Sequence, residues 1–225
     1  MKILIDVLGA DKGVGEIVKG AISALDKINY TPIFVGPEDE IKKYLPESIK
    51  GKYEIINAND LITNNDKPTT AIRRKKDSSM VMAFHALKDN KADGMISTGS
   101  TGDLLAGASL IIGRIENVDR AAITLIFPGL ESNTVILDVG ANLDINPELL
   151  VQFAKMGSSY AKVLFDIDKP KVGLLNIGTE EAKGNEQVKA AYELLKNSDI
   201  NFAGNVEPFN LLNNNVDVIV TDGFV

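Results

Sequence analysis

Short apolar runs rich in β-branched residues alternate with segments of helical length along nearly the whole chain. Residues 2–8 and 31–35 are such runs, whereas residues 15–27 place their apolar side chains on one helical face. This alternation favours a largely parallel sheet with helices on both faces, so we predict the α/β class. We predict further strands at 54–57, 94–97, 121–127, 134–138, 172–177, 202–203 and 216–221, and further helices at 38–44, 78–90, 104–113, 147–165 and 186–196. Residues 59–70, which include Pro68, are predicted to form a loop.

The composition is that of an ordinary globular protein. The 225 residues suffice for one large domain or two small ones, and we predict a single catalytic domain over 1–225. Cysteine is absent, which excludes disulfides, thiolate metal sites and a cysteine nucleophile. The formal net charge of −7 lacks the basic footprint of a nucleic-acid-binding protein. No apolar run approaches the roughly 20 residues of a membrane-spanning helix, so we expect a soluble protein.

Ligands of parallel α/β sheets bind beyond the carboxyl ends of the strands, so the loops that follow strands matter most. Ser97–Asp103 follows one predicted strand and combines two glycines with four hydroxyl side chains before a helix, which suits an anion. It has neither the Gly-Lys-Ser/Thr ending of a Walker A loop nor the spacing of a dinucleotide fingerprint. A plain tight turn with a Ser/Thr cap explains this loop equally well.

Four consecutive cations, Arg73 to Lys76, stand before a helix that Asp77 or Ser78 could cap. Cations at a helix N-terminus are unfavourable, so helix stability does not explain them. A solvated basic face, an anion site and a docking site for an acidic carrier protein are the alternatives.

Further polar residues follow other predicted strands. Asp138, Gly140 and Asn142 follow one strand, and Asn176 begins a loop with hydroxyl, carboxylate and lysine side chains. These groups could orient a substrate. Alternatively, Asp138 and Asn142 could fix a turn through side-chain-to-backbone hydrogen bonds, and the carboxylates after Asn176 could reflect the preference of acidic residues for helix starts. The remaining strand-end groups are Asp6, Asp11, Thr179, Glu180, Lys183, Asn185 and Asp222.

The sequence offers no evident covalent nucleophile. His85 is the only histidine and falls in a predicted helix away from the strand-end loops, so we predict neither a Ser-His-Asp triad nor a metal site. Loops suited to binding phosphate, in a chain without an evident nucleophile, favour direct transfer of a group between two positioned substrates over a covalent enzyme intermediate.

Several longer motifs resemble the bacterial phosphate acyltransferases of phospholipid synthesis. They are the segments 73–80, 137–142, 173–181, 183–186 and 221–225, and the similarity covers essentially the whole chain in order and spacing. The resemblance implies an isocitrate/isopropylmalate-dehydrogenase-like fold and a homodimer without cofactors. It implies transfer of a fatty acyl group from acyl-ACP to orthophosphate, which releases acyl carrier protein and gives acyl phosphate. It also implies a cytoplasmic protein that contacts the inner face of the membrane through a C-terminal part, which we expect to lie beyond Val225.

For the reaction that the resemblance implies, we hypothesise roles for the polar residues. Lys75 and Lys76 would supply positive charge, Arg73 and Arg74 would receive the acidic carrier protein, and Asn142 would line the phosphate pocket. We therefore predict catalytic roles for Lys75, Lys76, Asn142 and Asn176. The predicted substrate-binding residues are Asp6, Asp11, Arg73, Arg74, Ser97, Gly99, Ser100, Thr101, Gly102, Asp138, Gly140, Thr179, Glu180, Lys183, Asn185 and Asp222.

The chain departs from the family pattern in two loops. In the loop after the first strand, residues 6–13, Ala10 replaces a glycine. In the loop Ser97–Asp103, called the glycine loop below, Ser100 stands where asparagine is usual and Asp103 stands where alanine is usual. A carboxylate beside an anion site weakens phosphate binding. Two alternatives follow: a phosphate acetyltransferase-like enzyme for short acyl thioesters, and a non-catalytic relative that binds the acyl carrier.

Overall fold

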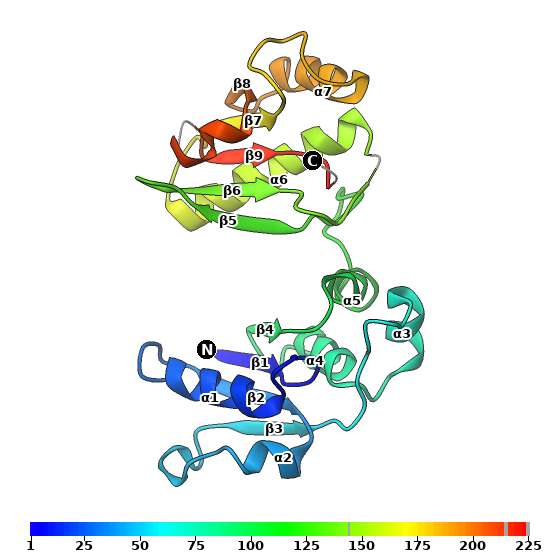
Figure 1. Ribbon diagram of the computed structural model, residues 1–225, viewed down its shortest axis with the longest axis vertical. Coiled ribbons are helices and arrows are strands. Elements are labelled where there is room, and N and C mark those ends of the chain that lie inside the picture. Colours follow the sequence, from blue (N-terminus) through cyan, green and yellow to red (C-terminus); the bar gives the residue numbers. More distant parts are fainter. Residues whose placement is uncertain (144, 214–215, 224–225) are drawn as a thin grey trace. The chain divides into compact units, whose positions relative to one another are not determined.

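The computed structural model describes residues 1–143, 145–213 and 216–223, and the chain divides into two compact units, Met1–Arg114 and Ile115–Val225. Each unit has its own sheet, as Figure 1 shows. The α/β class is confirmed, and the predicted strands are distributed over these two sheets. That the two units act together as one catalytic domain stays a prediction.

The first unit is built on a parallel sheet of four strands in the order β3-β2-β1-β4. The strands are β1 (Lys2–Asp6), β2 (Thr31–Gly36), β3 (Glu54–Asn57) and β4 (Gly94–Ser97). Asp6 pairs in register with Ser97, so the last residues of β1 and β4 lie side by side. Because the strands are parallel, the loops that follow them leave from one edge of the sheet.

Helices cover both faces of this sheet. The helices α1 (Val14–Ala24) and α2 (Glu38–Lys42) pack on the face that carries Ile5 and Phe34, whereas α4 (Ser79–Lys88) packs on the face that carries Leu4. Alternate strand residues point to opposite faces, which explains why these strands are apolar throughout. The remaining elements are η1 (Glu47–Ile49), α3 (Pro68–Arg74), α5 (Thr101–Gly107) and the π-helical turn η2 (Ala108–Ile112).

The second unit has a five-stranded sheet in the order β5-β6-β9-β7-β8. The strands are β5 (Thr124–Pro128), β6 (Asn133–Leu137), β7 (Val172–Leu175), β8 (Phe202–Val206) and β9 (Val218–Val220). The edge strand β5 is antiparallel to β6, and the other neighbours are parallel. The first residue of β5 therefore lies beside the last residue of β6, at the edge where β6, β7 and β9 end.

The two faces of the second sheet are covered differently. The helices α6 (Pro147–Phe165) and α7 (Glu186–Lys196) pack on one face, over residues such as Leu137 and Val218. Gly157 allows close approach, because a Cβ at that position would lie 2.5 Å from Val218 Cγ1. The opposite face packs against η3 (Pro208–Asn213) through Leu211.

Pro68 is the clearest difference between the predicted and the observed elements. It was expected in a loop, but it opens α3 at the first helical position, where proline costs no hydrogen bond. The predicted helix at 104–113 begins earlier, at Thr101, and ends in the π-helical turn. None of the helices in the described part of the chain has the length and hydropathy to cross a membrane.

Candidate functional site

The loops after β1 and β4 are tied together by Asp6, which is 1% exposed. Ser97 Oγ donates to Asp6 Oδ2 at 2.7 Å, and Leu8 N donates to Asp6 Oδ1 at 3.2 Å. Gly99 N in turn donates to Ser97 Oγ at 3.1 Å. Burial raises the pKa of Asp6, and these hydrogen bonds oppose the rise. Asp6 therefore orients Ser97, and Ser97 orients the glycine loop.

The glycine loop itself packs closely on the loop after β1. A Cβ on Gly9, whose φ is +88°, would lie 3.3 Å from Gly99 Cα. Ser100 accepts a hydrogen bond from Asp103 N at 3.5 Å and so caps α5. Thr101 and Gly102, which were predicted as loop residues, form the first turn of α5 and are exposed.

Asp103 lies 2% exposed in that first turn, and its Oδ1 has no hydrogen-bond partner. Burial raises the pKa of this carboxyl group, because the charged form is poorly solvated there. The nearby Asp66 carboxylate raises it further, whereas the Lys75 ammonium lowers it. The departure from the family pattern has thus placed a carboxyl group beneath the glycine loop.

Lys75 is engaged in fixing a loop. Its Nζ donates to Asp66 Oδ2 at 2.7 Å and to Leu61 O at 2.9 Å, and Asp66 also accepts from Thr63 N and Oγ1. The hydrogen bond from Lys75 lowers the pKa of Asp66 to about 2, and the same contact raises the pKa of Lys75. The predicted catalytic lysine therefore holds residues 61–66 against the end of α3.

The other three cations of the run are exposed, and no ion pair involves them among the described residues. Arg73 and Arg74 occupy the last turn of α3, where the helix dipole favours positive charge. The expectation that helix stability does not explain them was wrong, because α3 was not predicted. Lys76 follows Lys75, the C-cap residue of α3. Ser78 caps α4 by position while its Oγ donates to Lys75 O at 2.7 Å.

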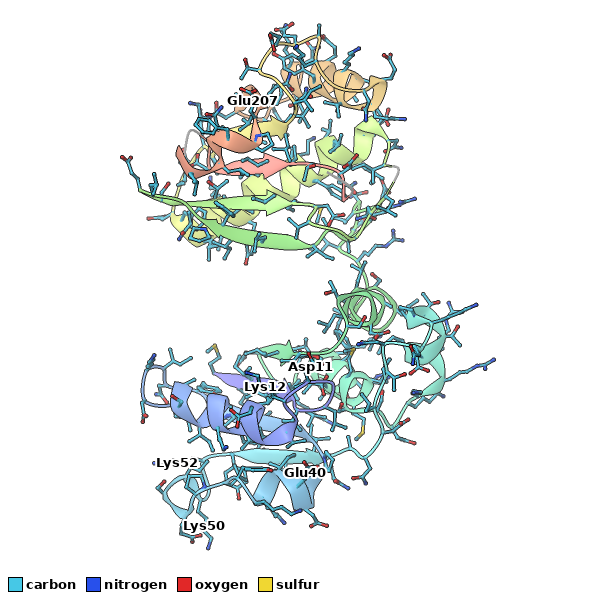
Figure 2. The ribbon with its side chains drawn as sticks, viewed as in Figure 1. Asp11, Lys12, Glu40, Lys50, Lys52 and Glu207 are labelled. Atoms are coloured by element: carbon cyan, nitrogen blue, oxygen red, sulfur yellow. The ribbon has the colours of Figure 1, made fainter. Side chains whose placement is uncertain are left out.

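Asp11 lies with Lys12 on the loop between β1 and α1, as Figure 2 shows. Both side chains are exposed, and Asp11 has no hydrogen bond or ion pair within the described residues. Gly13 and Ala10 of the same loop line a 410 Å³ hollow with Glu40 of α2. The predicted substrate contact of Asp11 stays a prediction.

In the second unit, Asp138 follows β6 and is 1% exposed. Its Oδ1 accepts from Ile123 N at 2.8 Å, and its Oδ2 accepts from Asn142 N at 2.7 Å and Asn142 Nδ2 at 3.0 Å. Ala141 N contacts both oxygens, at 3.1 and 3.0 Å. The carboxylate is therefore occupied with shaping the loop, a turn-fixing role that the sequence left as an alternative.

The loops after β6 and β9 meet at Asn142. This side chain is 8% exposed, and its Nδ2 also donates to Ala121 O at 2.8 Å. Gly223 N donates to Asn142 O at 2.8 Å, and a Cβ on Gly223 would lie 2.5 Å from that oxygen. Gly140 is exposed at φ +125°, and Asp222 is half-buried beside Gly223. The end of the 221–225 motif, residues 224 and 225, lies outside the described residues.

Two buried asparagines hold the loop after β7. Asn176 Nδ2 donates to Lys183 O at 3.0 Å while its Oδ1 accepts from Ile177 N at 2.8 Å. Asn205, near the end of β8, donates from Nδ2 to Glu180 O at 2.8 Å. Sequence analysis missed Asn205, although an asparagine close to the end of an apolar strand was a usable signal.

Between these anchors the loop is open to solvent. Thr179, Glu180, Lys183 and Asn185 are exposed, and Asn185 Oδ1 accepts from Val188 N at 2.9 Å as the N-cap of α7. The predicted residues thus form one group at the β1 and β4 ends of the first unit and another at the β6, β9, β7 and β8 ends of the second. No cluster of His, Asp or Glu able to hold a metal ion occurs within the described residues.

Comparison with known proteins gives a consistent picture. The family model described as "Fatty acid synthesis protein" matches residues 1–225. A phosphate acyltransferase from Clostridium botulinum (strain Alaska E43 / Type E3) is 49% identical, over 100% of this chain and 68% of that protein. The phosphate acyltransferase of Clostridium acetobutylicum is 48% identical, over 100% of this chain and 69% of that protein.

Two solved structures share the fold. The EutD phosphotransacetylase from Staphylococcus aureus matches with a TM-score of 0.65 at 19% identity, over 99% of this chain and 78% of that chain. A branched-chain phosphotransacylase from Enterococcus faecalis V583 matches with a TM-score of 0.64 at 11% identity, over 98% of this chain and 79% of that chain. At these identities the likeness concerns the fold alone.

Proposed function

Because the chain belongs to the fatty acid synthesis protein family of bacterial phosphate acyltransferases, we propose that it moves a fatty acyl group from acyl-ACP to orthophosphate. The product is acyl phosphate for phospholipid synthesis. The observation that carries the proposal is the match of the family model to residues 1–225, together with close relatives of that name. The strand-end loops support it, since they are fixed by buried carboxyl and amide groups rather than built around a nucleophile.

The reaction needs no acylated side chain. An oxygen of hydrogen phosphate attacks the thioester carbonyl carbon, the new C–O bond forms, the C–S bond breaks, and the leaving thiolate takes up the proton that the phosphate gives up. Charge that develops on the carbonyl oxygen requires N–H or cationic donors. Holding phosphate and thioester in line replaces a bimolecular encounter, which is a large part of the catalytic task.

We assign the buried residues to positioning. Asp6 acts through Ser97 on the glycine loop, and Asp138 acts through Asn142 on the loop after β6. The side-chain amide of Asn142 donates to Ala121 O and to the Asp138 carboxylate, and that of Asn176 donates to Lys183 O, so their contribution to catalysis is to fix these loops. The exposed groups Thr101, Thr179 and Lys183 and the half-buried Ser100 remain available for substrate contact.

The exposed cations Arg73, Arg74 and Lys76 are assigned to the acidic carrier protein. These three cations have no ion pair among the residues that the structure describes, and in a chain of net charge −7 they provide a local attraction that the whole molecule lacks. We also assign this protein a homodimeric state and peripheral contact with the membrane, both from family membership.

The test is phosphate-dependent release of free thiol from long-chain acyl-ACP. We expect release only when phosphate is present, and acyl phosphate in equal amount. Release from acetyl-CoA but not from acyl-ACP would favour the acetyltransferase alternative. Binding of carrier protein without any thiol release would favour a non-catalytic relative.

A further inference from the structure

An apolar groove of about 830 Å³ runs along α6 in the second unit. One wall is α6 itself, with Val151, Met156, Tyr160 and Val163. Ile115 and Val118 form part of the opposite wall. The polar groups that line it include Gln152, Lys155 and Ser159 of α6.

The groove borders the candidate site. Leu137 lines the groove and directly precedes Asp138. Thr124 also lines it and pairs with Leu137, and its neighbour Ile123 donates a hydrogen bond to Asp138. The loop that Asp138 shapes therefore starts at the wall of the groove.

The groove is long as well as apolar. Its lining residues on α6 extend from Glu148 to Val163, a separation of 15 residues. At the helical rise this corresponds to about 22 Å. Val163 is 86% exposed and Ile115 is 82% exposed, so large apolar side chains meet water at this groove. Exposed apolar surface of this kind marks an interaction site for a ligand, a protein or a membrane.

Two other hollows in the described part of the chain have a different chemistry, and the 410 Å³ hollow beside the loop after β1 is smaller than the α6 groove. The 630 Å³ hollow near the far end of α6 is lined by charged and hydroxyl groups such as Ser158, Asp168 and Lys169. The hollow beside β8 measures only 240 Å³. The α6 groove alone among these combines apolar walls, length and continuity with a strand-end loop.

Building on the proposed function, we propose that the α6 groove holds the acyl chain of the thioester donor. The carbonyl end would lie at the loop 138–142 and the methyl end near Val163. This would make the protein specific for long acyl chains, because only a long chain covers the exposed apolar side chains at the far end of the groove.

Tryptophan fluorescence can test this placement, because the chain contains no tryptophan. Val163→Trp puts a single reporter at the far end of the groove. The matched control is Leu194→Trp on α7, which is 42% exposed and does not line the groove. Circular dichroism of both variants checks the fold. Each is titrated with long-chain acyl-ACP brominated either at the methyl end or near the carbonyl, since bromine quenches tryptophan at contact.

We expect methyl-end bromine to remove most of the Val163→Trp emission, carbonyl-end bromine to remove much less, and Leu194→Trp to respond to neither. Equal quenching by both labels, or none, would overturn the proposal. The proposal would also be overturned if the fluorescence of Val163→Trp changed with protein concentration but not on addition of acyl-ACP, because a second copy of the protein would then cover the groove. Thiol release in the same samples separates the two proposals: release without quenching rejects the groove alone, and quenching without release rejects the proposed function alone.

Discussion

Replacing Asp138 by asparagine removes a buried carboxylate that accepts hydrogen bonds from the backbone of Ile123, Ala141 and Asn142 and from the Asn142 side chain. Asparagine is nearly isosteric but keeps only one oxygen, and its amide nitrogen cannot accept. At least one buried donor therefore loses its acceptor, and the remaining hydrogen bonds lose the assistance of the charge.

An unsatisfied buried donor costs about 1–3 kcal/mol, and a hydrogen bond to a charged group exceeds a neutral one by roughly 1 kcal/mol. An uncharged asparagine costs less free energy to bury than a carboxylate, which offsets part of this loss. We therefore expect Asp138→Asn to lower the free energy of unfolding by about 2–4 kcal/mol. The catalytic rate should fall as well, because the loop 138–142 loses its fixed shape.

Urea unfolding followed by circular dichroism measures the change in the free energy of unfolding. The slope of that free energy against urea concentration should be the same in both proteins, since a different slope would indicate a different unfolding reaction. Asp11→Asn is the matched control, because Asp11 is exposed and has no partner within the described residues, and we expect an effect below about 0.5 kcal/mol. An Asp138→Asn protein within about 1 kcal/mol of the wild type would refute the reasoning that this hydrogen-bond network determines the loop.

Three further changes test other parts of the molecule. Asp66→Asn should destabilise the protein at neutral pH, and the difference in melting temperature from the wild type should shrink as the pH falls from 3.8 towards about 2. Because the pKa of Asp66 is lower in the folded protein, its stabilising effect is complete above the pKa of the unfolded chain and is lost as the pH falls through the pKa of the folded protein. A difference in melting temperature that does not change with pH in that range would contradict this. Asp103→Ala should raise the free energy of unfolding by about 1–2 kcal/mol by removing a buried carboxyl group with an unpartnered oxygen, and an equal or lower value in urea unfolding would count against it. Lys76→Ala should raise the KM for acyl-ACP at low salt and leave the melting temperature unchanged, with Lys52→Ala, an exposed lysine elsewhere in the first unit, as control; equal KM values for the two variants would remove Lys76 from the carrier surface.

Local periodicity was enough to predict many elements from the sequence. The observed bounds of β3, β4, α6 and α7 match the predicted ones, because each has a clear apolar period and a clear start or stop signal. Helix α3 was missed because Pro68 was taken as a loop marker, although proline also suits a first turn. The division into two sheets depends on long-range pairing, such as β6 with β9, which local patterns do not encode.

The candidate site was predictable by residue type but not by partner. Sequence placed Asp6, Asp138 and Asn176 at strand ends, and the structure places them there. It could not show that Ser97, 91 residues away, donates to Asp6, or that Lys75 binds Asp66 and is thereby engaged. Such contacts depend on packing between distant segments, so residue type and spacing suggest the chemistry while the hydrogen bonds distinguish positioning groups from exposed ones.

The central claim is that phosphate attacks the thioester directly, without an acylated side chain. Mass spectrometry of the intact protein during steady turnover with long-chain acyl-ACP and phosphate tests it most directly. The account predicts that the protein keeps its unmodified mass while acyl phosphate accumulates. A protein species heavier by one acyl group, which forms before phosphate is added and disappears when it is supplied, would contradict it.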